Sequence, residues 1–137
     1  MNKKTVAIRC LALAAALTVA LLADAADVVV VMGPTAAAVS KDQVANVYLG
    51  RSTDFTPLDL PESSAVRDAF YKKAADRDAA QVKAVWTRIT FTGQGKPPKE
   101  MPDAAAVKKA VAADPKAIGY IDKSEADASV KIVLTLP

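Results

Sequence analysis

An apolar segment near the N-terminus determines which part of the chain is available to fold. Three basic side chains precede an almost wholly apolar run over 10–23, and Ala23-Asp24-Ala25 then supplies a small-x-small site. This is the pattern of a secretory signal cleaved after Ala25. A transmembrane anchor is the alternative, but an uncharged run of about 14 residues is shorter than the roughly 20 that span a bilayer. We therefore predict a signal peptide over 1–25 and one domain over 26–137, exported to the periplasm.

The charge balance changes once the signal is set aside. The chain of 137 residues carries 18 Lys and Arg against 15 Asp and Glu, a net charge of +3. That value alone would suggest a nucleic-acid or membrane-surface partner. The signal holds three of the basic and one of the acidic side chains, so the remaining 112 residues carry a net charge of +1. A nearly neutral domain is not typical of a nucleic-acid binder, and 112 residues can bury a core without disulfides.

The residue types that are missing exclude most enzyme chemistry. The chain has no His, and its single Cys, Cys10, lies in the predicted signal. A His general base, a Ser-His-Asp triad and a Cys- or His-rich metal site are therefore excluded. The acids are scattered, and Asp78 and Asp103 are explained as helix caps. We predict no catalytic residue, no metal and no cofactor, and a protein that is not an enzyme.

Strands and helices alternate along the domain. The β-branched run Val28-Val29-Val30-Val31 predicts a strand buried on both faces. Three further strands are predicted, over 56–60, 117–121 and 129–134. Four helices are predicted from caps and apolar spacing, beginning at Ser40, at Ser63 and Ser64, at Asp78, and at Pro102-Asp103. The alternation predicts an α/β domain with a small open sheet flanked by about four helices.

The start of the second helix is the strongest candidate for a binding site. Ser63 and Ser64 supply two hydroxyls beside the free N–H groups of a first turn, and Arg67 adds a guanidinium. Such an N-terminus suits an anion. An ordinary Ser cap without a ligand is the alternative. Asp59 and Glu62 lie close by in the sequence and would repel a multivalent anion.

Two other features have plain structural explanations. The loop over 93–99 is rich in Gly, Lys and Pro, but it lacks the spacing of a phosphate-cradling motif and its following Ser or Thr. A solvated connection between helices is the favoured interpretation. Trp86 and Phe91 are expected to be core aromatics of the third helix, rather than a surface on which a ligand stacks.

Several segments, in their order and spacing, resemble one lobe of the periplasmic phosphate-binding proteins of ABC transporters, and most closely its short single-lobe members. The resemblance covers roughly 27–134. It rests on an F-x-G turn after a Trp helix, on an A-I-G-Y strand and on the segments that precede them. These segments are 48–51, 61–64, 69–71, 84–93 and 117–121.

The resemblance implies a single lobe of a type II periplasmic-binding-protein fold. The full family has two lobes that close on phosphate, and one lobe places a Ser-Gly-Thr turn at a helix N-terminus against the anion. Ser64 matches the Ser of that turn, whereas Ala65 and Val66 replace the Gly and Thr, and the second lobe is absent. The resemblance thus implies phosphate or another small anion as ligand at Ser63, Ser64 and Arg67, and an ABC transporter as partner.

A single lobe offers an open face to its ligand. An exposed helix N-terminus contributes about 0.3–1 kcal/mol toward an anion, against the roughly 8 kcal/mol of micromolar binding. Tight capture would need a second wall, from a partner chain or a homodimer. A ligand-free interaction or sensory module of the cell envelope is the alternative function.

Overall fold

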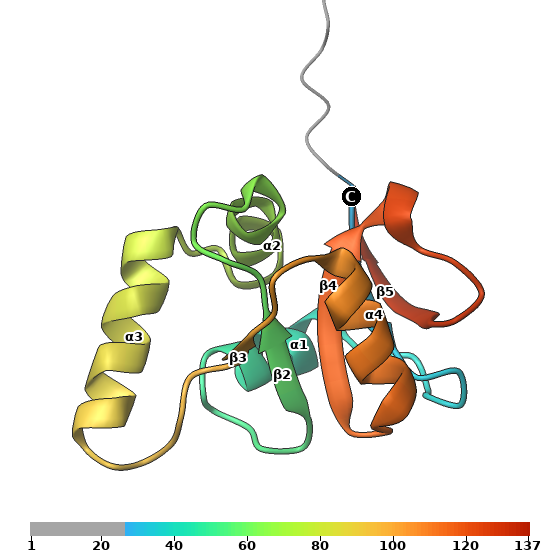
Figure 1. Cartoon of the computed structure of the whole chain (residues 1–137). Coiled ribbons are helices and arrows are strands. Elements are labelled where there is room, and N and C mark those ends of the chain that lie inside the picture. The colour runs from blue at the N-terminus through green and yellow to red at the C-terminus, as the bar shows by residue number, and fades with distance from the viewer. Residues whose placement is uncertain (1–26) are drawn as a thin grey trace, which may run out of the picture.

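A mixed five-stranded sheet forms the centre of the domain (Figure 1). The computed structural model describes residues 27–137, so the predicted signal peptide lies outside the described residues. The strands follow the order β3-β2-β4-β1-β5 across the sheet. Their bounds are Val28–Met32 (β1), Thr56–Asp59 (β2), Lys99–Glu100 (β3), Ala117–Asp122 (β4) and Lys131–Leu136 (β5).

Strand β1 lies inside the sheet and explains the run of valines. It pairs antiparallel with β4 on one side and with β5 on the other, while β4, β2 and β3 run parallel to one another. All five residues of β1 are buried. A strand that is covered on both faces has no side exposed to water, and its sequence is therefore a continuous run of apolar residues. The prediction of a doubly buried first strand is confirmed.

Four α-helices begin where the capping residues predicted. Ser40 and Asp78 each form a reciprocal capping box with the Gln three residues later, and Ser64 and Asp103 cap the other two helices. These boxes satisfy N–H groups that the first turn leaves unpaired. The helices span Lys41–Tyr48 (α1), Ala65–Ala75 (α2), Ala79–Phe91 (α3) and Ala104–Ala113 (α4), and a 3₁₀ turn, η1, spans Lys123–Glu125.

The helices cover the sheet unequally. Helix α4 packs on β4 and β1, whereas α1 packs on β2 and α2 on β1, β4 and β5. Helix α3 stands at one side of the domain and contacts mainly α2 (Figure 1). Its anchor is Trp86, whose Nε1 donates a hydrogen bond to the carbonyl oxygen of Tyr48 at 2.9 Å. None of the helices in the described part of the chain is long and apolar enough to cross a bilayer.

Helix α4 approaches β4 closely because position 119 is Gly. A Cβ atom added there would lie 2.5 Å from Cγ1 of Val107 and 3.6 Å from Cγ1 of Val111. We expect Gly119→Ala to lower the free energy of unfolding by about 1–3 kcal/mol, as overpacked cores do. Urea unfolding would measure the loss. In a Val107→Ala background the same substitution should cost clearly less, and equal costs in both backgrounds would contradict the proposed clash.

The structure differs from the sequence-based predictions at one aromatic side chain, Phe91, and at two strands, β3 and β5. Phe91 is 92% exposed rather than part of the core, because it is the last residue of α3 and lies five positions beyond Trp86, on another side of the helix. Strand β3, two exposed residues beside β2, was not predicted. Strand β5 extends to Leu136, two residues beyond its expected end.

Candidate functional site

A buried carboxylate lies at the end of β2. Asp59 is only 6% exposed, between the buried side chains of Leu58 and Leu60. Its Oδ2 accepts a hydrogen bond from the hydroxyl of Tyr71 at 2.7 Å, and its Oδ1 accepts one from the hydroxyl of Tyr120. The backbone N–H of Leu60 also donates to Oδ1, at 2.9 Å. A carboxylate in an apolar layer is tolerated only when its oxygens are engaged in this way.

All three tyrosines of the chain belong to this cluster. The rings of Tyr120 and Phe70 stack at 3.8 Å, and Tyr48 meets Phe70 edge-on at 4.7 Å. The hydroxyl of Tyr48 lies 2.7 Å from the carbonyl oxygen of Leu58. Burial raises the pKa of all three phenols above the ordinary value, and the nearby Asp59 charge raises them further. The phenols therefore remain neutral donors at physiological pH.

Arg67 completes the cluster from the first turn of α2. Its Nε lies 3.3 Å from Oδ1 of Asp59, and the two side chains are 9% and 8% exposed. The guanidinium also lies over the ring of Tyr71, 5.2 Å from the centroid. Its Nη1 is buried without a hydrogen-bond partner. Burial opposes the charge of Arg67, but the adjacent Asp59, together with Tyr71 and Tyr120, outweighs it and raises the pKa of the guanidinium. Arg67 is thus a fixed cation with one donor atom left over.

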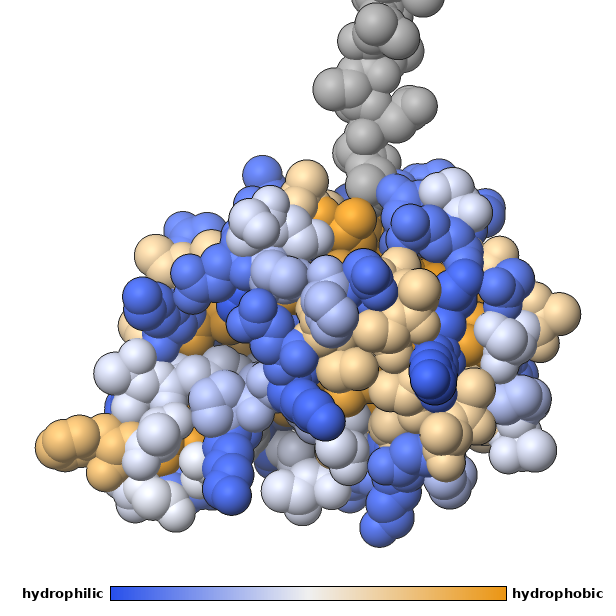
Figure 2. Space-filling model, in the orientation of Figure 1, coloured by the Kyte–Doolittle hydropathy of each residue, from blue (hydrophilic) through white to orange (hydrophobic). Residues whose placement is uncertain are grey.

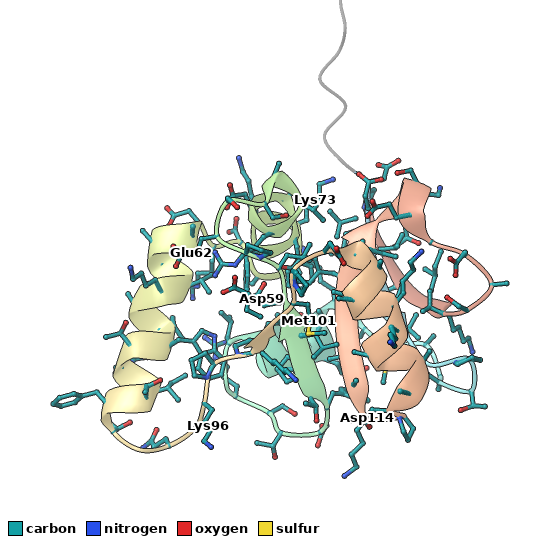
Figure 3. The ribbon with its side chains drawn as sticks, viewed as in Figure 1. Asp59, Glu62, Lys73, Lys96, Met101 and Asp114 are labelled. Atoms are coloured by element: carbon teal, nitrogen blue, oxygen red, sulfur yellow. The ribbon has the colours of Figure 1, made fainter. Side chains whose placement is uncertain are left out.

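An open cleft of about 510 Å³ lies between this cluster and α3. Arg67 and Asp59 line it from one side, and Trp86 lines it from α3. Figure 3 shows Asp59 near the middle of the domain, with Glu62 toward the upper end of α3. The remaining lining residues come from α3, from the segment before α2 and from the chain around β3. They are Leu60, Glu62, Val82, Lys83, Thr87, Thr90, Phe91, Pro97, Pro98 and Glu100.

The three predicted site residues share one turn but face different surroundings. The backbone N–H of Arg67 donates to Oγ of Ser64 at 3.3 Å, so Ser64 is the cap of α2. Its hydroxyl proton is still available to a ligand. Ser63 is exposed one residue earlier. Only Arg67 lines the cleft, whereas Ser63 and Ser64 lie outside its lining.

The other sequence features remain structural. The loop over 93–98 connects α3 to β3, with Lys96 pointing away from the domain (Figure 3). Within residues 27–137, no group of three or more acidic, His or Cys side chains is placed to hold a metal ion. Asp59 differs from the helix-capping acids Asp78 and Asp103, because it is buried in the core and paired with Arg67. Its position between two Leu residues in a strand was the available signal.

Comparisons with known proteins give a fold rather than a sequence family. No protein-family model and no curated protein matches the sequence. One similar solved structure is described as a phosphate ABC transporter substrate-binding protein from Clostridium perfringens with bound phosphate, at a TM-score of 0.63 and 20% identity. Another is an ABC-type phosphate transport receptor from Vibrio cholerae, at 0.60 and 18%.

The matches also indicate which portion of those proteins this chain corresponds to. Each alignment covers 80% of this chain but only 45% or 47% of the solved one, so the chain spans about half the length of the structures it matches. The expectation of an α/β lobe with a small open sheet is confirmed. The chain therefore has the fold of a single lobe of a periplasmic binding protein, the fold that those phosphate transport proteins share.

Proposed function

We propose that this chain is an exported solute-binding domain that takes phosphate or another small anion at the N-terminus of α2. The observation that carries the proposal is Arg67, a buried cation with an unpartnered Nη1 in the first turn of that helix. The hydroxyls of Ser63 and Ser64 and the free N–H groups of the turn would complete the anion's donors. The fold of the phosphate transport proteins supports a solute-binding role over catalysis.

The electrostatics favour weak binding of a small anion by this lobe alone. The charge of Asp59 is compensated by Arg67 and by two phenol donors, so it opposes an anion less than its position in the sequence suggested. Glu62 remains exposed and unfavourable. The helix N-terminus contributes about 0.3–1 kcal/mol and a hydrogen bond from the Arg67 guanidinium about 1.5–3 kcal/mol, so the affinity reaches at best the roughly 4 kcal/mol of millimolar binding. We propose that a transporter, another envelope protein or a second copy of the chain supplies the second wall.

Ligand stabilisation tests this proposal. For a dissociation constant near ~1 mM, ~10 mM phosphate should stabilise the fold by about 1.4 kcal/mol, which corresponds to a rise of roughly 4–8 °C in the melting temperature. The control is chloride at matched ionic strength. An unchanged melting temperature in phosphate would contradict the proposal.

Two variants locate the site. Ser63→Ala removes an exposed hydroxyl, and the lost hydrogen bond should weaken phosphate binding by about three- to tenfold, so that the thermal shift falls to a fraction of its original size. Ser40→Ala is the matched control, because it removes a helix cap at α1 and should lower the melting temperature without altering the phosphate shift. An equal phosphate shift in both variants would place the anion elsewhere.

A further inference from the structure

The cleft beside Arg67 is much larger than a tetrahedral anion. Its volume of about 510 Å³ falls in the range of about 300–1,000 Å³ typical of pockets for organic ligands, whereas one water occupies about 30 Å³ of liquid. Free phosphate at the start of α2 would leave most of this space unfilled.

The walls of the cleft are mainly apolar. They include two proline rings and the indole of Trp86, and they continue to the exposed ring of Phe91 at the end of α3. Figure 2 shows a hydrophobic projection at the lower left, where α3 ends. The apolar lining residues are Leu60, Val82, Trp86, Phe91, Pro97 and Pro98. Such a surface favours a ligand with an apolar body.

The charges of the cleft limit the negative charge that a ligand can carry, because three acidic and two basic side chains line it. Arg67 is paired with Asp59, and Lys83 is outnumbered by Glu62 and Glu100. The lining therefore opposes a dianion more strongly than a monoanion, and a monoanion binds only where a specific donor offsets this repulsion. The unpartnered Nη1 of Arg67 is a buried donor that lacks an acceptor, and the carboxylate of a monoanion supplies one.

We infer that the ligand is an organic monoanion, a carboxylate with an aromatic or branched aliphatic body. The carboxylate, the head of the ligand, lies toward Arg67. Its aromatic or aliphatic group, the body, packs against Trp86 in the cleft. The inference rests on the proposed function, because it names the class of anion that the same site takes. It differs from that proposal because the ligand must have an apolar group as well as a negative charge.

The fluorescence of Trp86 reports on the cleft directly, because it is the single Trp of the chain. Titration of the purified protein with phenylacetate should change this fluorescence saturably. Acetate shares the head but lacks the body, and it should bind about tenfold or more weakly, since an aromatic side chain contributes that much on burial. Phenethylamine shares the body but carries a positive charge, and it should give no saturable change. Equal affinities for phenylacetate and acetate, or tighter binding of phenethylamine, would overturn the inference.

A matched pair of variants tests where the body lies. Phe91→Ala removes an exposed ring at the cleft and should weaken phenylacetate binding severalfold while leaving the melting temperature unchanged. Ile132→Ala removes the other exposed large apolar side chain of the described residues, on β5 and outside the cleft lining, and should leave the affinity unchanged. Equal effects of the two variants on phenylacetate affinity would contradict the placement of the ligand's body in the cleft.

Inorganic phosphate separates this inference from the proposed function. A thermal shift in phosphate without a fluorescence response to phenylacetate overturns the organic ligand and leaves the proposed anion site standing. A saturable response to phenylacetate without a phosphate shift supports the organic monoanion and overturns phosphate as the ligand.

Discussion

Asp59→Asn is expected to lower the free energy of unfolding by about 3–5 kcal/mol, because it leaves Arg67 charged and buried without its counter-ion. Domains of this size are stable by only about 5–15 kcal/mol, so the variant should unfold at a much lower urea concentration. The amide keeps the shape of the carboxylate, and the loss therefore reports on charge rather than on volume. Fluorescence of Trp86, whose indole is hydrogen-bonded to the backbone of Tyr48, follows the transition.

Two controls distinguish a buried ion pair from a general effect of substitution. Adding Arg67→Met to Asp59→Asn removes the stranded cation, so the double variant should lose less than the sum of the two single losses. Lys108 and Asp127 form an ion pair at the surface, 2.9 Å apart, and Lys108→Met should have a much smaller effect. A loss for Asp59→Asn as small as that of Lys108→Met would contradict the role assigned to the cluster.

Alkaline pH should unfold the protein through its tyrosines. Their pKa values are raised in the folded state, chiefly by burial, so the unfolded chain releases phenol protons near pH 10 while the folded chain retains them. Stability is therefore unaffected by these groups below about pH 10 and falls above it. Each phenol contributes about 1 kcal/mol between pH 10 and pH 11, while its ionisation in the unfolded chain is still incomplete, so three together give about 3 kcal/mol.

Urea unfolding at a series of pH values would measure this slope. Tyrosinate absorbance should appear together with the unfolding transition, since the folded cluster does not ionise. Tyr48→Phe should reduce the slope by about a third, whatever it does to stability at neutral pH. Ionisation of all three tyrosines near pH 10 in a protein that is still folded would show that the phenols are not buried.

Local signals predicted the parts of the fold that local interactions determine. The capping boxes at Ser40 and Asp78 fix two helix starts through hydrogen bonds within one turn, and the apolar run of β1 marks the middle of the sheet. Strand β3 has no such signal, since its two exposed residues become a strand only by pairing with β2. Phe91 illustrates the same limit, because the end of α3 faces open space that only the tertiary arrangement defines.

The candidate site was predicted in part for the same reason. The turn holding Ser63, Ser64 and Arg67 could be found from capping residues and from a family resemblance. The hydrogen-bonded surroundings of Asp59 could not, since Tyr71 and Tyr120 reach it from 12 and 61 residues away. The cleft is also a product of tertiary structure, because its walls come from α3 and from the chain around β3.

The order of the strands sets when the domain can fold. Strand β1 comes first in the domain, but its two neighbours are the last strands, with Val28 paired to Asp122 and to Leu136. The middle of the sheet thus depends on closing loops of about 90 residues or more, and such distant contacts slow folding. For a protein that is exported as we propose, this connectivity would keep the chain unfolded and able to thread a secretion channel until its final strand has emerged.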